Sequence, residues 1–318
     1  MSLSANLKIR RKEIKMTQKE LAEKVGVEPA TISKYESGMN EPNIKILKSI
    51  AEALDISIDE LVKEEEDIVD LSKVNLLEIL REQKEMKLSG NIYHYTQVKF
   101  AYNTNHIEGS TLTEEETRYI YETNTIVSTS DNPTKVDDII ETVNHFRIVD
   151  YLIDNADKKL TESMIKEFHR ILKSGTSDST KTWFKVGEYK MLENQIGEQK
   201  TAKPNEVPQK MKELLSSYNK KKKIILEDII DFHAKFEAIH PFQDGNGRVG
   251  RIIMFKECLK NNIDPFIILD ADKYFYYRGL KEYKKEKGYL IDTCLNAQDQ
   301  YRASMEYFLK GYTKLNNK

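Results

Sequence analysis

Residues 240–251 read HPFQDGNGRVGR, and they separate two segments that have the apolar spacing of buried helices. Before this stretch, apolar residues recur at alternating intervals of four and three, the repeat of one buried helix face, at Ile225, Ile229, Phe232, Phe236 and Ile239. The first helix is expected to end at His240, because the residue before a proline resists the α conformation. A second buried helix is expected to follow and to end near Asn262. The sequence therefore predicts a short polar loop held between two core helices.

The loop has the composition of an anion site. Gly245, Asn246 and Gly247 allow a tight bend in which successive backbone amides point at one place, and the second helix begins there. A helix N-terminus also favours a bound anion. Arg248 and Arg251 are three positions apart, so they lie on neighbouring helical positions and can hold further phosphate oxygens. We expect this loop to bind a phosphate group.

Two further residues supply a metal ligand and a base. Asp244 adjoins the phosphate site, where Mg²⁺ is usually held by one or two carboxylates together with phosphate oxygens. His240 can accept a proton near neutral pH. A dinucleotide-binding loop is rejected, because a helix rather than a strand precedes these glycines. A zinc site at His233, His240 and Asp244 has no recognised spacing. The combination predicts transfer of a phosphorus-containing group.

The whole string resembles the Fic family motif H-x-F-x-[D/E]-G-N-G-R-x-x-R at every specified position. The resemblance covers about residues 90–310 and implies a helical core with a β-hairpin flap. It further implies transfer of AMP from ATP to a Ser, Thr or Tyr hydroxyl of a protein. The hairpin is expected between Tyr189 and Pro204 with its turn at Gly197, where it would clamp a target segment by strand addition. An exposed loop is the alternative for that segment.

The resemblance also implies a role for each residue of the loop. His240 is expected to be the general base, and Asp244 to bind the Mg²⁺ that bridges the α- and β-phosphates. The backbone amides of Gly245, Asn246 and Gly247 are expected to hold the α- and β-phosphates of ATP, with the Asn246 side chain as an added donor. Arg248 is expected to contact the β-phosphate, and Arg251 the γ-phosphate.

An inhibitory segment is expected upstream. Thr104, Glu108 and Gly109 match the motif [S/T]-x-x-x-E-[G/N] that the Fic family places before its catalytic loop. A helix that merely ends at Gly109 is the simpler interpretation of the same residues. The resemblance implies that Glu108 pairs with Arg251 and blocks the productive pose of ATP. A further hypothesis is that Glu108 positions water to remove AMP from a modified target.

The first 62 residues have the punctuation of a small helical bundle. Thr17 and Glu20 have capping-box spacing, Gly26 ends that helix, and Pro29 opens the next one. Residues 6–62 resemble the phage-repressor-like (XRE) helix-turn-helix family, which implies that helix 30–37 enters the major groove. The residues expected to contact DNA are Gln18, Pro29, Ala30, Thr31, Ser33 and Lys34. A protein-interaction module of the same fold is the alternative.

Composition sets the broader limits. The chain has 318 residues with 50 Lys and Arg against 52 Asp and Glu, so its net charge gives no hint of a nucleic-acid partner. Scarce Gly and Pro favour a mainly helical, all-α fold. Two cysteines fit a reducing cytoplasm, and the lack of a long apolar run argues against a membrane protein. The expected domains are 1–63 (helix-turn-helix), 64–89 (linker and amphipathic helix), 90–134 (inhibitory helix region) and 135–318 (catalytic domain).

Together with these patterns, the two family resemblances imply a self-inhibited protein adenylyltransferase with an N-terminal DNA-binding domain. Its expected partners are ATP, Mg²⁺, DNA, an unidentified target protein and a second copy of the chain. Three alternatives stay open. The helical core could sense nucleotide for a transcriptional regulator, it could transfer a different phosphorus-containing group, or it could both attach and remove AMP.

Overall fold

The computed structural model describes residues 3–62, 71–126, 133–196 and 199–310. The chain divides into two compact units, Met1–Val69 and Asp70–Lys318. The boundary expected between residues 63 and 64 lies outside the described residues, and the finer divisions expected within the second unit stay predictions.

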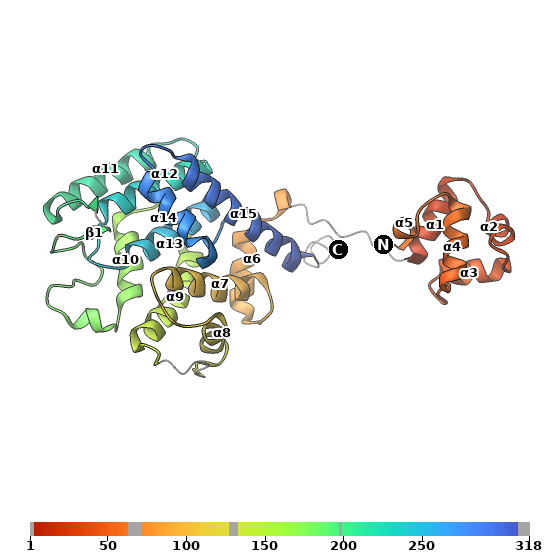
Figure 1. Ribbon diagram of the computed structural model, residues 1–318, viewed down its shortest axis with the longest axis horizontal. Coiled ribbons are helices and arrows are strands. Elements are labelled where there is room, and N and C mark those ends of the chain that lie inside the picture. The colour runs from red at the N-terminus through yellow and green to blue at the C-terminus, as the bar shows by residue number, and fades with distance from the viewer. Residues whose placement is uncertain (1–2, 63–70, 127–132, 197–198, 311–318) are drawn as a thin grey trace. The chain divides into compact units, whose positions relative to one another are not determined.

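The first unit is a bundle of short helices around one apolar core (Figure 1). Thr17 caps the second helix, and the side chain of Glu20 accepts a hydrogen bond from the Thr17 amide at 2.7 Å, which completes the expected capping box. Gly26 ends that helix with φ 77°. Leu7, Leu21 and Ile32 are fully buried at the centre. The helices are α1 (Leu3–Glu13), α2 (Gln18–Val25), α3 (Pro29–Glu36), α4 (Ile44–Leu54) and α5 (Ile58–Val62).

The second unit is also built from helices, with one pair of very short strands (Figure 1). Its helices are α6 (Leu76–Met86), α7 (Ile92–Ile107), α8 (Glu114–Thr123), α9 (Val136–Asn155), α10 (Glu162–Lys173), α11 (Val207–Asn219), α12 (Leu226–Ile239), α13 (Asn246–Lys260), α14 (Lys273–Glu282) and α15 (Gly288–Leu309). Single 3₁₀ turns lie at Leu71–Lys73, Ser177–Thr180, Pro204–Glu206 and Asp270–Asp272. The mainly helical fold expected from the sequence is confirmed.

Helix α13 lies at the centre of this unit. Helices α7, α9, α10 and α12 all pack against it, and nearly every one of its residues is buried. Phe255 on α13 packs against Phe100 of α7 and Tyr301 of α15, with ring centroids 5.1 and 5.7 Å apart. The N-terminus of α13 therefore opens onto a site whose walls come from several helices.

Two sequence expectations need correction here. Ile225 does not belong to the buried stripe, because it is the N-cap of α12 and is 47% exposed, whereas Ile229, Phe232 and Phe236 are buried. Helix α6 begins only at Leu76, since Asn75 caps it with a side-chain hydrogen bond to the amide of Glu78. The amphipathic helix expected within residues 64–89 thus covers only Leu76–Met86.

The hairpin is small. Strands β1 (Gln195–Ile196) and β2 (Gln199–Lys200) pair antiparallel, with Gln195 opposite Lys200. The turn expected at Gly197 lies outside the described residues. No helix in the described part of the chain is long and apolar enough to cross a membrane.

Candidate active site

The loop expected between two buried helices is present and is held by its own side chains. Helix α12 ends at Ile239 because His240 takes a left-handed conformation with φ 53°. Helix α13 begins after Gly245, whose φ of 79° favours glycine. Between them, the Asn246 side chain accepts a hydrogen bond from the Phe242 amide at 2.8 Å and donates one to the Phe242 carbonyl at 2.9 Å. The side chain of Asn246 thus closes the loop. The family resemblance had implied a different role, in which this side chain donates a hydrogen bond to the bound phosphate.

A buried histidine that the sequence did not reveal supports the loop from below. His169 on α10 stacks on the Phe242 ring with centroids 4.0 Å apart and an angle of 1° between the planes. Its Nδ1 accepts a hydrogen bond from the amide of Gly187 at 2.9 Å, and its Nε2 lies 3.2 Å from the carbonyl oxygen of Asp244. Burial and the nearby Lys173 charge lower the pKa of His169 to about 3, so the ring is neutral and Nε2 donates. This places the backbone of Asp244.

Glu108 and Arg251 meet although 143 positions separate them. Glu108 is the C-cap of α7, and its Oε1 lies 2.7 Å from Nη2 of Arg251. The Arg251 side chain is 2% exposed and also donates to the Thr104 hydroxyl at 2.6 Å and to the Tyr276 hydroxyl at 3.3 Å. Gly109 follows with φ 97°, which ends the helix. Thr104 and Glu108 of the expected inhibitory segment therefore contact the arginine predicted to take the γ-phosphate.

The carboxylate of Glu108 also lies over the first turn of α13, where the sequence predicts the anion site; we call this turn the anion cradle. A methyl group added at Gly247 would run into Oε1 of Glu108, and it would come within 3.0 Å of Nη1 of Arg251. Gly247 is in the first turn of α13, where the exposed amides and the helix dipole favour a negative group. In this structure that negative group is a side chain of the protein.

A second charge cluster surrounds the expected metal ligand. Asp244 Oδ2 lies 2.8 Å from the ammonium of Lys173 and 3.2 Å from Nη2 of Arg248. Lys173 is 3% exposed and also contacts Glu141 at 2.7 Å and Asp178 at 3.0 Å. Arg248 forms a close ion pair with Glu141 on α9. Arg248, expected to take the β-phosphate, is thus already paired with two carboxylates.

These cations keep Asp244 ionised. Partial burial alone would raise the pKa of Asp244, but the charges of Arg248 and Lys173 outweigh it and hold the pKa well below its usual range. The side chain is 51% exposed, and both of its ion pairs end on Oδ2. Among the described residues, no group of three or more His, Cys, Asp or Glu side chains is arranged to hold a metal. A single accessible carboxylate fits a magnesium ion that takes its other ligands from phosphates and water.

The candidate base is neutral at physiological pH. Burial, and then the charge of Lys190, lower the pKa of His240 to about 4. The imidazole can therefore accept a proton at pH 7. Glu237 lies one turn earlier on α12, with Oε2 3.8 Å from Nδ1 of His240. Burial and the charge of Glu108 raise the pKa of Glu237 to about 8, so this carboxyl group is mostly protonated at neutral pH.

Lys190 joins the hairpin to the candidate base. Its ammonium donates to the Asn194 side chain at 2.6 Å and to the Thr201 hydroxyl at 2.7 Å, and its amide donates to the carbonyl of Pro241 at 2.9 Å. The amide of Ala202 donates to the carbonyl of Ile239 at 3.3 Å. The segments on both sides of the hairpin are thus attached to the loop that carries His240.

The residues expected to contact DNA lie together on α2 and α3 of the first unit. Pro29, Ala30, Ser33 and Lys34 are exposed, and Thr31 is half-buried. Gln18, the expected phosphate contact, instead donates to Glu36 Oε2 at 2.8 Å. Arg11, one of the basic residues near the start of the chain, is only 8% exposed and pairs with the same carboxylate through Nε at 2.5 Å. Neither side chain is free to meet a phosphate in this conformation.

The functional partners that sequence analysis missed are Glu141, His169, Lys173, Lys190 and Tyr276. Each is a buried or half-buried polar side chain that contacts a residue far along the chain. Four of them lie in helices, and Lys190 lies in the irregular segment before the hairpin. None belongs to a short motif, so the sequence offered no signal for them.

Two segments of the chain match known family models. Residues 159–258 match the Fic/DOC family model, and residues 7–61 match a helix-turn-helix model. The chain is 26% identical over 185 residues to the protein adenylyltransferase Fic of Nematostella vectensis, covering 57% of this chain and 42% of that protein. Its first residues are 44% identical over 62 residues to the uncharacterized HTH-type transcriptional regulator YqaE of Bacillus subtilis (strain 168), covering 20% of this chain and 53% of that one. The chain thus spans about half the length of these relatives.

A solved structure shares the fold. The crystal structure of a Fic domain containing signaling protein from Bacteroides thetaiotaomicron matches with a TM-score of 0.54 at 24% identity, over 74% of this chain and 93% of that one.

Proposed function

We propose that this chain, in which a Fic/DOC family domain follows a helix-turn-helix domain, is a protein adenylyltransferase held inactive by Glu108. The observation that carries the proposal is the position of the Glu108 carboxylate, over Gly247 and 2.7 Å from Arg251. A carboxylate at a phosphate site both repels the γ-phosphate and occupies the arginine that would bind it. ATP can then enter only in a pose that does not react.

The proposed transfer step gives each residue of the loop a role. A target hydroxyl attacks the α-phosphorus of ATP, its proton passes to the neutral imidazole of His240, and the bond to the β-phosphate breaks. The products are an AMP ester and pyrophosphate. The amides at the start of α13 and the guanidinium groups of Arg248 and Arg251 would stabilise the charge that develops. Most of the rate gain would come from positioning and charge stabilisation.

Asp244 is the residue that would hold Mg²⁺. The ion would neutralise phosphate charge and orient the triphosphate. Lys173 helps to keep the Asp244 carboxylate ionised, and the His169 contact holds the Asp244 backbone.

The helix-turn-helix unit supports DNA binding as a second activity. Its α3 presents four exposed residues of the expected contact set, Pro29, Ala30, Ser33 and Lys34. Arg10 and Lys12 of α1, which packs against α3, add positive charge to this unit, although Arg10 pairs with Glu13. One such unit offers few phosphate contacts, so binding should need a dimer on two half-sites. Sedimentation velocity with and without a DNA duplex tests this directly.

Intact-protein mass spectrometry tests the enzyme. Wild type, Glu108→Gly and the double variant Glu108→Gly/His240→Ala are each incubated with Mg²⁺ and ATP. The proposal expects a mass gain of one AMP group in Glu108→Gly alone. A gain of a phosphate or of another group would identify a different transfer reaction. No covalent gain on the chain or on added cell proteins would rule out adenylyl transfer.

A nucleotide-sensing transcriptional regulator is the second candidate, favoured by the paired state of Arg248 and Arg251. The two candidates differ at His240, because sensing needs no base. If ATP changes DNA affinity equally in wild type and in His240→Ala, and neither Glu108→Gly nor wild type labels any protein, the regulator is the better description.

A further inference from the structure

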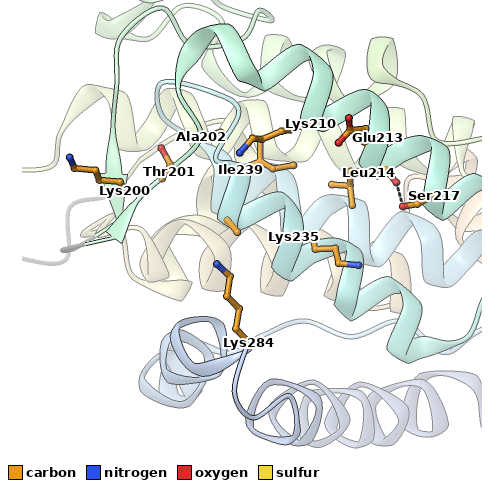
Figure 2. Close-up of a pocket in the computed structure, with 11 residues that line it drawn as sticks. Lys200, Thr201, Ala202, Lys210, Glu213, Leu214, Ser217, Lys235, Ile239 and Lys284 are labelled. Carbon is orange, nitrogen blue, oxygen red and sulfur yellow. Dashed lines mark hydrogen bonds between the residues drawn. The ribbon is translucent and has the colours of Figure 1, made fainter.

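A lysine-lined groove lies beside the hairpin and has no role in the reaction described so far (Figure 2). Its cavity volume is about 550 Å³. Lys200 of β2, Lys210 of α11, Lys235 of α12 and Lys284, which follows α14, line it together. In Figure 2 the side chains of Lys210 and Lys284 approach the hollow from opposite sides. The floor includes Ile239, the residue before His240.

The groove carries an excess of positive charge. Against its four lysines stands one acidic residue, Glu213, which already accepts a hydrogen bond from Gln209 at 2.6 Å. Lys235 pairs with Asp231 on its own helix at 2.6 Å, and Lys210 with Glu206 at 3.3 Å. Lys200 and Lys284 are exposed, and no residue in the described part of the chain forms an ion pair with either. Two cations of the groove are thus available to an anionic partner.

The position of the groove indicates what that partner is. Ala202, which lines it, is hydrogen-bonded to the carbonyl of Ile239, so the groove runs from the hairpin to the residue next to His240. We expect a polypeptide that presents a hydroxyl to His240 and pairs with the hairpin to pass along this surface. Apolar patches at Leu214 and Ile239 can take its aliphatic parts.

A nucleic acid fits less well. Sites for single-stranded nucleic acid combine a basic groove with aromatic side chains on which bases stack. The residues that line this groove, all in the described part of the chain, include no aromatic side chain. The lysines of the groove come from four separate segments, so they surround a short stretch of polypeptide rather than follow an extended backbone.

We propose that this groove binds an acidic segment of the target polypeptide, whose hydroxyl group is modified with His240 as the base. The inference rests on the proposed transfer reaction and adds its substrate class: the acceptor hydroxyl lies next to Asp or Glu residues. Because the contacts are between exposed charges, the preference should weaken as salt is raised.

Fluorescence anisotropy without nucleotide tests the binding separately from the reaction. The probes are three labelled peptides that share a central serine and differ only in their flanks, of Glu, Gln or Lys. The groove variant is Lys200→Glu/Lys284→Glu. The control is Lys212→Glu/Lys222→Glu, which makes the same charge change at exposed lysines outside the groove. All are made in the full chain.

The wild type and the control should bind the Glu peptide about tenfold more tightly than the Gln peptide, and the groove variant should lose that preference, since each exposed ion pair contributes a few-fold. The proposal is overturned if the Gln peptide binds equally well, or if the control loses as much as the groove variant. It is also overturned if a thymidylate oligonucleotide outcompetes the Glu peptide at the groove. Self-labelling of Glu108→Gly is measured in parallel. Labelling without a peptide preference contradicts the groove proposal alone, and a peptide preference without labelling contradicts the transfer reaction alone.

Discussion

Replacing Glu108 tests the proposed brake most directly, and the structure sets the size of the effect. The carboxylate forms a charge-assisted hydrogen bond of 2.7 Å to Arg251, and the arginine is 2% exposed. A hydrogen bond to a charged group contributes about 1.5–3 kcal/mol net. At about 1.4 kcal/mol per tenfold, removing it should shift the site toward the productive pose by roughly 10- to 150-fold.

Three variants separate charge from shape. Glu108→Gly removes the whole side chain and should raise the initial rate of self-labelling by the full factor. Glu108→Gln keeps the shape but not the charge, so its rate should lie between wild type and Glu108→Gly. Glu115→Gln is the matched control, because Glu115 is an exposed glutamate on α8. ATP affinity should change less than rate, since the wild type is expected to bind ATP unproductively.

The thermal stability of Glu108→Gly should fall while its labelling rate rises. Arg251 keeps its hydrogen bonds to Thr104 and Tyr276, so it stays in place, but it loses its counter-charge. A loss of about 1.5–3 kcal/mol corresponds to a fall on the order of 5 °C in Tm for a unit of this size. MgATP should restore much of it, because the γ-phosphate replaces the lost carboxylate. If Glu108→Gly labels no faster than Glu115→Gln, the brake is not Glu108.

The other predictions concern the base, the cation cluster and a buried histidine. In the Glu108→Gly background, His240→Ala should reduce labelling at least about 100-fold while ATP binding is kept, as measured by isothermal titration calorimetry. The pKa of His240 is lowered to about 4, so the rate should stay level as pH falls from about 8 to about 5 and drop only below that. A midpoint near the ordinary histidine pKa of about 6.5 would show that burial and Lys190 do not lower the pKa of His240. Lys173→Met should tighten Mn²⁺ binding, measured by electron paramagnetic resonance, because a cation leaves the side of Asp244. The same variant should lower Tm, because Glu141 and Asp178 each lose one of their cationic partners. Unchanged Mn²⁺ affinity would show that Lys173 does not compete with the metal. Burial lowers the pKa of His145 to about 3. Below a pH of about 6.5 the unfolded chain therefore takes up a proton that the folded chain does not. As the pH falls further, the free energy of unfolding decreases by about 1.4 kcal/mol per pH unit. His145→Phe should flatten the pH dependence of urea unfolding by that slope, and an unchanged slope would mean that His145 is protonated in the folded state.

The loop itself could be predicted because its signals are local. The apolar repeat of α12 and the break at Pro241 are properties of neighbouring residues, and so is the glycine-bounded start of α13. The structure places the loop where the sequence indicated. The capping box at Thr17 is local in the same way, and it forms as expected.

Pairings across the fold could not be predicted in this way. In the sequence, Arg11 is one of several basic residues near the start of the chain, but in the structure it is buried against Glu36, 25 positions away. Lys173 gives no sign in the sequence that it will lie against Asp244, 71 positions away. Such contacts depend on which helices pack together, and no periodic pattern in a single sequence shows that packing. The contact between Glu108 and Arg251 was expected only through family resemblance.

The cations of the cradle explain why control should fall on Glu108. Lys173, Arg248 and Arg251 all have carboxylate partners, so an incoming triphosphate must compete with charges of the protein itself. Glu141 is fixed within α9 and its side chain is 13% exposed, so it cannot leave without moving the helix. Glu108 lies at the end of α7, its side chain is 29% exposed, and the following Gly109 can change conformation cheaply. A partner that pulled on the end of α7 would therefore free Arg251 and the α13 amides together, while the Glu141 cluster kept Arg248 in place.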